Sequence, residues 1–251
     1  MKTIRATAKF IAFFAMTFGI YSLWFLASLL KTKNSKRRLR EFIFENWSRT
    51  FVRVANAKLK VIGTPPAPPF ILISNHTSYF DIAALRSAAK CIFVAKADIA
   101  SWFAAGTMVH NMGTIFIDRQ NRRDIPRAGA DIIEALEGGE GVAIFAEGTT
   151  SSGKQVLEFK SSLLEFAAMR DLPVHYASIN YKTPLGEPSA SEAVCWWREE
   201  SGFASHLWNF FKLPRFSCTI TFGSQPVHAK DRKVLATELQ QAVSRQFEPL
   251  I

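Results

Sequence analysis

The sequence predicts an α/β domain with a mixed, mostly parallel sheet flanked by helices, preceded by an N-terminal hydrophobic helical segment that anchors it to a membrane. Three observations support this fold class. Short apolar runs bounded by glycine, proline or polar residues alternate with segments of helical periodicity. Polar residues gather where several of these runs end. Residues 10–30 contain no charged residue, and a stretch of this length can cross a bilayer.

The length of 251 residues allows one sizeable domain with an appendage. We expect residues 1–58 to form the membrane anchor with its basic and amphipathic segment, and residues 59–251 to form the α/β domain. The net charge of +10 is concentrated in the anchor, because residues 1–40 hold nine of the 31 basic residues and none of the 21 acidic ones. The charge pattern therefore favours an anionic lipid surface as the partner and argues against nucleic acid.

The flanks of the apolar segment predict its orientation. Three basic residues precede residues 10–30 and six follow them before residue 41, which places the domain on the cytoplasmic face of the inner membrane. A single span and a re-entrant hairpin that bends near Gly19 both fit the pattern. The three cysteines lie far apart in apolar surroundings and are predicted to be buried free thiols: Cys91, Cys195 and Cys218.

The elements between the anchor and the first central strand follow from spacing. In residues 41–60, Phe42, Trp47 and Phe51 recur at helical intervals among basic residues, which is typical of an amphipathic helix. Residues 59–62 are predicted to form a short strand. The proline-rich stretch 63–69 then breaks the chain before the central sheet begins.

From residue 70 onward, predicted strands and helices alternate. The strands are short apolar runs that end in glycine, proline or polar residues: 70–74, 91–96, 113–119, 141–145, 174–180 and 216–222. The helices between and after them have amphipathic spacing: 82–90, 97–112, 127–136, 161–170 and 231–246. Residues 183–215 are rich in aromatic residues, serine and glutamate and give no clear pattern.

The end of the strand at residues 70–74 carries the first candidate site. His76 follows this strand directly, and Asp81 stands five residues later. Ser78 and Asp81 have the spacing of a helix N-terminal capping box, so Asp81 is expected in the first turn of a helix. A histidine held by a carboxylate can act as a general base near neutral pH. Taken alone, Asp81 is equally well explained as a helix cap.

Two further strand ends carry polar groups. The strand at 113–119 ends in Asp118 and Arg119, and a guanidinium matches the geometry of an oxyanion such as phosphate. The strand at 141–145 is followed closely by Glu147, a glycine and two threonines. For Arg119 and Glu147 taken singly, a structural ion pair is the more common role.

Together these residues resemble the glycerolipid acyltransferase family that includes bacterial 1-acylglycerol-3-phosphate acyltransferases. Asn-His-Thr-Ser-x-x-Asp at 75–81 is similar to the His-x4-Asp block of that family, Gly-x-Ile-Phe-Ile-Asp-Arg at 113–119 to its second block, and Phe-x-Glu-Gly-Thr-x-Ser at 145–151 to its third. Lys96 and the Phe-Lys at 159–160 match further positions. The resemblance covers about residues 60–225, in the family's order.

The resemblance implies transfer of a fatty acyl group from an acyl thioester, acyl-CoA or acyl carrier protein, to a hydroxyl of a lysolipid. It implies that His76 deprotonates the acceptor and that Asp81 orients the imidazole. No metal and no cofactor is expected, because the thioester is already activated. The residues expected to bind substrate are Asn75, Ser78, Lys96, Asp118, Arg119, Glu147, Gly148, Thr149, Thr150 and Lys160.

The sequence departs from the family's pattern on the side expected to bind the acceptor. The usual Phe-Pro-Glu-Gly-Thr-Arg-Ser has Ala146 in place of proline and Thr150 in place of arginine. The fourth block, normally built around Val-Pro, reads Pro-Val-His-Tyr at 173–176. We expect 1-acylglycerol-3-phosphate as the acceptor in phospholipid biosynthesis, with another lysolipid such as lyso-ornithine lipid as the alternative.

Two other classes of function compete with an acyltransferase. Residues 148–155 approximate a phosphate-binding loop of a nucleotide hydrolase or kinase, but Gln155 lacks the magnesium-binding hydroxyl. A membrane-tethered lipid-binding protein without catalysis is the third possibility. The presence of both His76 and Asp81 argues against that third possibility.

Overall fold

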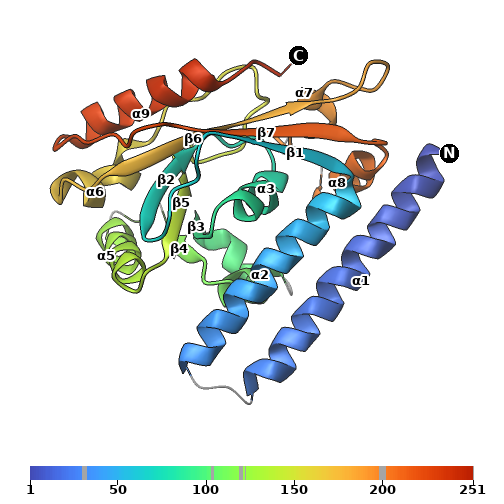
Figure 1. The fold of residues 1–251 in the computed structure, drawn as a ribbon, viewed down its shortest axis with the longest axis horizontal. Coiled ribbons are helices and arrows are strands. Elements are labelled where there is room, and N and C mark those ends of the chain that lie inside the picture. The colour runs from blue at the N-terminus through green and yellow to red at the C-terminus, as the bar shows by residue number, and fades with distance from the viewer. Residues whose placement is uncertain (30–32, 103–104, 119–120, 122, 198–201, 251) are drawn as a thin grey trace.

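The computed structural model describes the chain except for residues 30–32, 103–104, 119–120, 122, 198–201 and 251. Helices and strands alternate through most of it (Figure 1). The strands are β1 (Ala57–Ile62), β2 (Phe70–Ser74), β3 (Cys91–Lys96), β4 (Ile115–Ile117), β5 (Gly141–Phe145), β6 (Val174–Lys182) and β7 (Phe216–Phe222). The helices are α1 (Lys2–Leu29), α2 (Lys33–Ala55), α3 (Phe80–Ala88), α4 (Ala105–Asn111), α5 (Asp124–Glu137), α6 (Glu165–Met169), α7 (Ala190–Ala193), α8 (Phe203–Phe211) and α9 (Arg232–Gln246). Two short 3-10 helices, η1 (Ala97–Ser101) and η2 (Ser161–Leu164), complete the described elements.

The strands form a single mixed sheet. Over the described residues it has seven strands in the order β1-β7-β6-β2-β5-β3-β4. All neighbouring pairs are parallel except β6 and β7, which are antiparallel. The predicted α/β fold with a mostly parallel sheet is confirmed. Because β2, β3, β4 and β5 point the same way, the loops that follow them leave the sheet at one edge.

Each face of the sheet has its own hydrophobic core. The central strands alternate between the two, since Leu72 and Phe145 belong to the core under α2, α3 and α8, whereas Ile73 and Ile144 belong to the core under α5, α6 and α9. Figure 1 shows α9 on one side of the sheet and α3 with α2 on the other. Strands buried on both faces read as continuous apolar runs, which is why β2 and β5 were legible in the sequence.

The N-terminal segment is a pair of long helices. In Figure 1, α1 and α2 run side by side, with α2 between α1 and the sheet. The indole Nε1 of Trp47 donates to Thr17 Oγ1 across the pair at 3.0 Å. By length and composition alone, α1 could cross a membrane. Its outer face is apolar and exposed, and that face is what we expect a bilayer to cover: Ile4, Ile11, Phe14, Phe18, Leu23, Phe25, Leu26 and Leu29.

Polar contacts tie α1 to the domain at two points, Lys9 and Tyr21. The ammonium of Lys9 donates to the carbonyl oxygens of Ala55 and Leu213, at 2.8 and 2.9 Å. Toward the other end, Asn111 Nδ2 donates to the Tyr21 hydroxyl at 2.8 Å. Residues of α1 and of the second half of α2 also belong to the same core as the sheet. The predicted boundary between an anchor at 1–58 and a domain at 59–251 stays a prediction, and the two parts share one core.

Several helices differ in extent from the sequence-based expectation. The helix predicted at 127–136 begins at Asp124, because Pro126 fits the first turn, where no intrahelical N–H donor is needed. The helical regions expected at 97–112 and 161–170 are each a 3-10 helix followed by a short α-helix. The region 183–215, which had no legible pattern, contains α7 and α8.

Candidate active site

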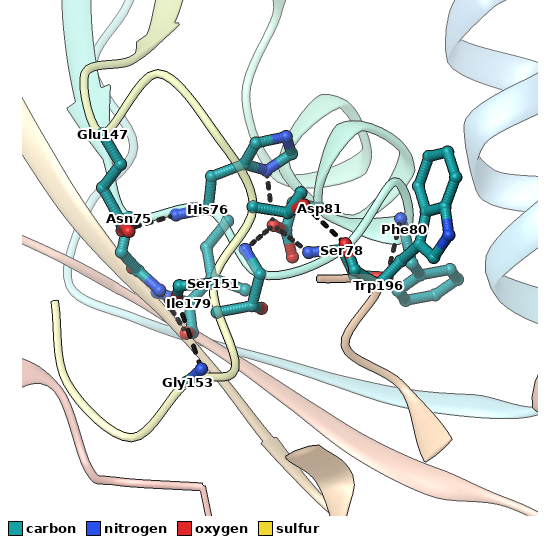
Figure 2. A network of polar contacts seen from close by, with 12 residues as sticks. Asn75, His76, Ser78, Phe80, Asp81, Glu147, Ser151, Gly153, Ile179 and Trp196 are labelled. Carbon is teal, nitrogen blue, oxygen red and sulfur yellow. Dashed lines mark hydrogen bonds and ion pairs between the residues drawn. The ribbon is translucent and has the colours of Figure 1, made fainter. Parts of the chain in front are cut away.

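The loop after β2 is fastened to β6 by an asparagine. The side chain of Asn75 donates to the carbonyl oxygen of Ile179 at 3.0 Å and accepts from its N–H at 2.7 Å. Asn75 is only 1% exposed. We expected Asn75 to contact substrate, but both groups of its amide are engaged by the backbone of β6. In this structure it fixes the point at which the chain leaves the sheet (Figure 2).

His76 and Asp81 form a direct pair. The Nδ1 atom of His76 lies 2.8 Å from Oδ2 of Asp81. The Asp81 side chain is fully buried, while that of His76 keeps 17% of its surface exposed. Oδ2 of Asp81 also accepts from the N–H groups of Thr77 and Ser78, at 2.7 and 2.9 Å. A buried carboxylate with these donors is compatible with a negative charge, and it lies in the first turn of α3, where the helix dipole favours an anion.

The geometry of the pair assigns roles to the two ring nitrogens of His76. Because the Asp81 carboxylate accepts a hydrogen bond from Nδ1, that nitrogen carries the proton of the neutral ring. The lone pair of Nε2 is then available to accept a second proton. The imidazole stacks on the Phe145 ring, with centroids 4.0 Å apart and an interplanar angle of 9°. The ring orientation is therefore set from two directions, by a carboxylate and by an aromatic face.

The segment after β5 holds the backbone of His76. Oε1 of Glu147 accepts from the His76 N–H at 2.9 Å, and the N–H of Ser151 donates to the His76 carbonyl oxygen at 2.9 Å. Gly148 turns the chain between them with a φ of 77°, a conformation that favours glycine. We expected Glu147 to bind substrate, and in this structure it holds the backbone of the histidine loop.

The carboxyl group of Glu147 has an unusual acidity. It is 2% exposed, and burial raises its pKa from 4.5 to about 7, with the nearby charge of Asp81 adding to the rise. Hydrogen bonds from the backbone of His76 and Leu157 act in the opposite direction. The group therefore changes its charge close to neutral pH.

The capping box expected at Ser78 and Asp81 is half formed. The carboxylate of Asp81 accepts from the Ser78 N–H, as in a capping box. The Ser78 hydroxyl, however, accepts from the Phe80 N–H at 3.2 Å and not from that of Asp81. Ser78 is fully buried, so its observed contacts lie within the turn, whereas we expected it to bind substrate.

A segment without a legible sequence pattern closes the site on one side. The N–H of Trp196 donates to the Thr77 carbonyl oxygen at 2.8 Å, and the Thr150 hydroxyl donates to the Trp196 carbonyl oxygen. Trp196 thus joins the loop after β2 to the loop after β5. The Trp196 ring lies 5.7 Å from the Tyr79 ring and 6.4 Å from the Trp102 ring. Thr150 was expected to face a head group, and its hydroxyl faces this backbone instead.

The remaining residues expected to bind substrate lie at the edge of the sheet. The side chains of Lys96, Asp118, Thr149 and Lys160 are exposed. The Lys160 N–H donates to the Ala146 carbonyl oxygen at 2.8 Å, which keeps Lys160 beside the loop after β5. Arg119 lies outside the described residues.

Tyr181 is a site residue that the sequence did not single out. Its hydroxyl donates to Oδ1 of Asp81, and it is 4% exposed. It lies one residue beyond the strand predicted at 174–180, which extends to Lys182 in the structure. Extending the alternation of that strand would have placed Ala177, Ile179 and Tyr181 on one face, but nothing in the sequence connects that face to Asp81.

Neither a metal centre nor a nucleotide loop is formed by the described residues. Over that part of the chain, no cluster of three or more His, Cys, Asp or Glu side chains could hold a metal ion. The segment of residues 148–155 continues to residue 160 without helix, so the helix that would follow a phosphate-binding loop is missing there. The three cysteines are buried and free.

A cavity of about 490 Å³ lies on the other face of the sheet from His76. Apolar residues of β3, β4, β5, α5 and α6 line it, including Val94, Ile117, Ile144 and Phe166. Its described lining includes none of the residues predicted to bind substrate or to react. The candidate active site is therefore the group of polar residues at the edge of the sheet, and not this cavity.

Comparisons with known proteins show which family the sequence matches. The model of the family described as "Acyltransferase" matches residues 54–180, about half of the chain. A 1-acyl-sn-glycerol-3-phosphate acyltransferase of Neisseria gonorrhoeae is 29% identical over 182 residues, covering 71% of this chain and 70% of that protein. A lyso-ornithine lipid O-acyltransferase of Brucella abortus (strain 2308) is 28% identical over 255 residues, covering 96% and 93%.

A solved structure has the same overall fold. The crystal structure of the 1-acyl-sn-glycerophosphate acyltransferase of Thermotoga maritima superposes with a TM-score of 0.70 and covers 98% of both chains. At 21% sequence identity, this similarity supports the fold, including the N-terminal helices. The family match includes His76, Asp81, Asp118 and Glu147, so every block of the candidate site up to Lys160 falls within it.

Proposed function

This chain belongs to the acyltransferase family, and we propose that it moves a fatty acyl group from an acyl thioester to the free hydroxyl of a lysolipid. The observation that carries the proposal is the pair between His76 Nδ1 and Asp81 Oδ2 at 2.8 Å. This pair leaves Nε2 of His76 as a proton acceptor at the edge of the sheet. The relatives act on lysolipids by their names, which supports the same class of acceptor here.

The proposed reaction needs one base and no metal. As the acceptor oxygen attacks the thioester carbonyl carbon, its proton passes to Nε2 of His76. Asp81 stabilises the imidazolium through the proton on Nδ1. The carbon–sulfur bond then breaks, and the departing thiolate takes the proton back from Nε2, which returns His76 to its neutral form. The products are the acylated lipid and the free thiol of coenzyme A or of acyl carrier protein.

We propose 1-acylglycerol-3-phosphate as the acceptor, with lyso-ornithine lipid as the second candidate. The exposed cations Lys96 and Lys160 lie in segments that leave the same edge of the sheet as His76 and could hold a phosphate. The second candidate is supported by four lyso-ornithine lipid O-acyltransferases among the relatives, each 27–29% identical over 78–96% of this chain.

The direct test is an acyl-transfer assay on the purified full-length protein in lipid vesicles. The donor is labelled acyl-CoA in one series and the labelled acyl thioester of acyl carrier protein in the other. The acceptor is lysophosphatidic acid, lyso-ornithine lipid or lysophosphatidylcholine. We expect transfer without ATP and in the presence of EDTA, with lysophosphatidic acid as the best acceptor. If lyso-ornithine lipid has the higher kcat/KM, the second candidate replaces the first. Absence of transfer to every lysolipid from a folded protein would refute the function.

We further propose that the α1–α2 pair holds the enzyme on the cytoplasmic face of the inner membrane. A helix that spans the bilayer has its two ends on opposite sides, whereas α1 contacts the domain through Lys9 near one end and Tyr21 toward the other. These contacts support insertion of the exposed face of α1 into one leaflet. The basic residues of α2, among them Lys36 and Arg38, would face anionic head groups.

Vesicle binding distinguishes this arrangement from a loose association. The variants Phe18→Asp and Leu26→Asp place a charge on the exposed face of α1, away from the domain. We expect both to weaken sedimentation with phosphatidylglycerol vesicles, while Thr237→Asp, at an exposed position of α9 on the other side of the sheet from α1, serves as the control. Unchanged sedimentation of the two apolar-face variants would place the membrane contact elsewhere.

A further inference from the structure

The two oxygens of the Asp81 carboxylate have different surroundings. Oδ2 interacts with three groups of its own loop, namely His76 Nδ1 and the N–H groups of Thr77 and Ser78. Oδ1 accepts from the hydroxyl of Tyr181. Tyr181 comes from β6, one hundred residues further along. The reacting pair is therefore bonded to its own loop through one oxygen and to the sheet through the other.

The Tyr181 side chain has little freedom to move. It is 4% exposed, and its ring lies 6.2 Å from the Phe80 ring and 6.0 Å from the Phe216 ring. Its Cα is paired with that of Cys218 in the antiparallel ladder between β6 and β7. A phenol packed against two neighbouring rings on a paired strand presents its hydroxyl at a fixed place, which is what a positioning group requires.

Strand β6 contacts the catalytic loop twice. Ile179 bonds both groups of the Asn75 amide at the start of the loop, and Tyr181 bonds Asp81 at its end. Both residues point to the same face of the sheet because they are two apart on one strand. The loop between these two anchors carries His76.

We propose that Tyr181 is a positioning residue for acyl transfer, whose hydroxyl holds Oδ1 of Asp81 so that Oδ2 stays aimed at His76 Nδ1. Two backbone donors converge on Oδ2, but they leave the carboxylate free to tilt about that oxygen. A hydrogen bond to the second oxygen removes this freedom. The inference rests on the proposed function, and it adds a residue that does not touch substrate.

The charged and titratable groups around Asp81 are consistent with this role. Burial raises the pKa of the Tyr181 phenol well above its usual value, so the hydroxyl remains a proton donor over the working range. Burial likewise raises the pKa of the Cys195 thiol to about 12 and that of Cys218 well above its usual value, so neither adds charge. Of the described residues, Glu147 and His76 also interact with Asp81.

The test compares Tyr181→Phe with Tyr176→Phe in the full-length enzyme. Tyr176 lies on the same strand but packs against the core on the opposite face, so it controls for the loss of a tyrosine hydroxyl from β6. We expect Tyr181→Phe to lower kcat by about tenfold with KM within twofold, and Tyr176→Phe to leave both within twofold. Wild-type activity in the same assay separates a failure of this inference from a failure of the proposed function.

The pH profile of kcat/KM supplies a readout that a purely structural role would not move. Without the phenol, the charge of Asp81 is less well stabilised and attracts the imidazolium more strongly. The acid limb, which reports neutral His76, should therefore move to higher pH by about half a unit. Replacing Tyr181 with 3-fluorotyrosine keeps the shape and makes the phenol a stronger donor, so the limb should move the other way.

Three outcomes would overturn the inference. The first is a kcat for Tyr181→Phe that equals that of Tyr176→Phe. The second is a lower melting temperature together with an unmoved acid limb, which would give Tyr181 a structural role only. If Tyr181→Phe fails to fold, the 3-fluorotyrosine protein decides the matter, and an unchanged acid limb in that protein is the third.

Discussion

The loop that carries His76 and the connection that carries Asp118 leave the same edge of the sheet but are held in different ways. In the first, Asp81 is fully buried and is bonded by the loop and by Tyr181. In the second, the Asp118 side chain is exposed, and its N–H donates to Asp124 at 2.7 Å. The proposed reacting pair is therefore held by contacts within the protein itself. Lys96 and Lys160, which we expect to bind the head group, likewise have exposed side chains.

The largest expected effect comes from a substitution in the buried loop that carries His76. Asp81→Asn keeps the size of the side chain but removes the charge that stabilises the imidazolium of His76. We expect kcat to fall by at least ~100-fold with little change in KM. The measurement is steady-state acyl transfer on protein whose fold is verified by circular dichroism. A kcat within fivefold of wild type would show that the carboxylate is not part of the reacting pair.

A second prediction concerns Glu147, which joins the two loops. Its pKa is raised from 4.5 to about 7, so between these values the folded protein keeps a proton that the unfolded chain has lost. Stability therefore declines as pH rises through this window and stays lower above it. Glu147→Gln keeps an oxygen for the His76 N–H but has no such titration.

The difference in unfolding free energy between Glu147→Gln and wild type should grow by about 3 kcal/mol from pH 4.5 to pH 8 in favour of the variant. Urea denaturation at both pH values measures it. Glu158→Gln, an exposed carboxylate in the following segment, is the matched control. A difference that stays constant with pH would mean that folding does not change the pKa of Glu147.

Substitution of the exposed cations at the edge of the sheet should change KM. Lys96→Ala and Lys160→Ala each remove a cation from the edge of the sheet, and we expect KM for lysophosphatidic acid to rise by about tenfold at nearly constant kcat. Lys154→Ala removes an exposed cation that the proposed site does not use, and it should leave KM within twofold. Equal effects of all three variants would indicate a general electrostatic attraction and no defined head-group site.

The smallest expected effect concerns Thr150. Because its hydroxyl donates to the Trp196 carbonyl oxygen, Thr150→Val should cost about 1 kcal/mol of stability. It should change the preference between lysophosphatidic acid and lyso-ornithine lipid by less than threefold. A larger change in that ratio of kcat/KM values would show that Thr150 contacts the acceptor head group, as the sequence suggested.

The local parts of the site could be read from the sequence, and the long-range parts could not. The spacing of His76 and Asp81 and the buried strand before them are properties of twelve consecutive residues, 70–81. The partner of Oδ1 is Tyr181 on another strand, and no local pattern links the two. The same holds for Trp196, which joins two loops from a region without legible periodicity.

Some expected substrate contacts are contacts within the protein. Asn75, Ser78 and Thr150 each have their polar groups engaged by backbone, and Glu147 accepts from the His76 N–H. A motif records which residues occur together. The sequence alone does not show which of these residues bind substrate and which hold the substrate-binding residues in place. The fold class was legible because strands buried on both faces have a distinctive composition.

The most direct test of a preformed His76–Asp81 pair is the rate of acyl transfer by His76→Ala, with His110→Ala as an exposed histidine control. If His76 is the base, its loss should reduce kcat by at least ~100-fold while lysolipid binding and the melting temperature stay close to wild type. The His110→Ala enzyme should transfer at the wild-type rate. Transfer by folded His76→Ala protein at a rate close to wild type would contradict the mechanism.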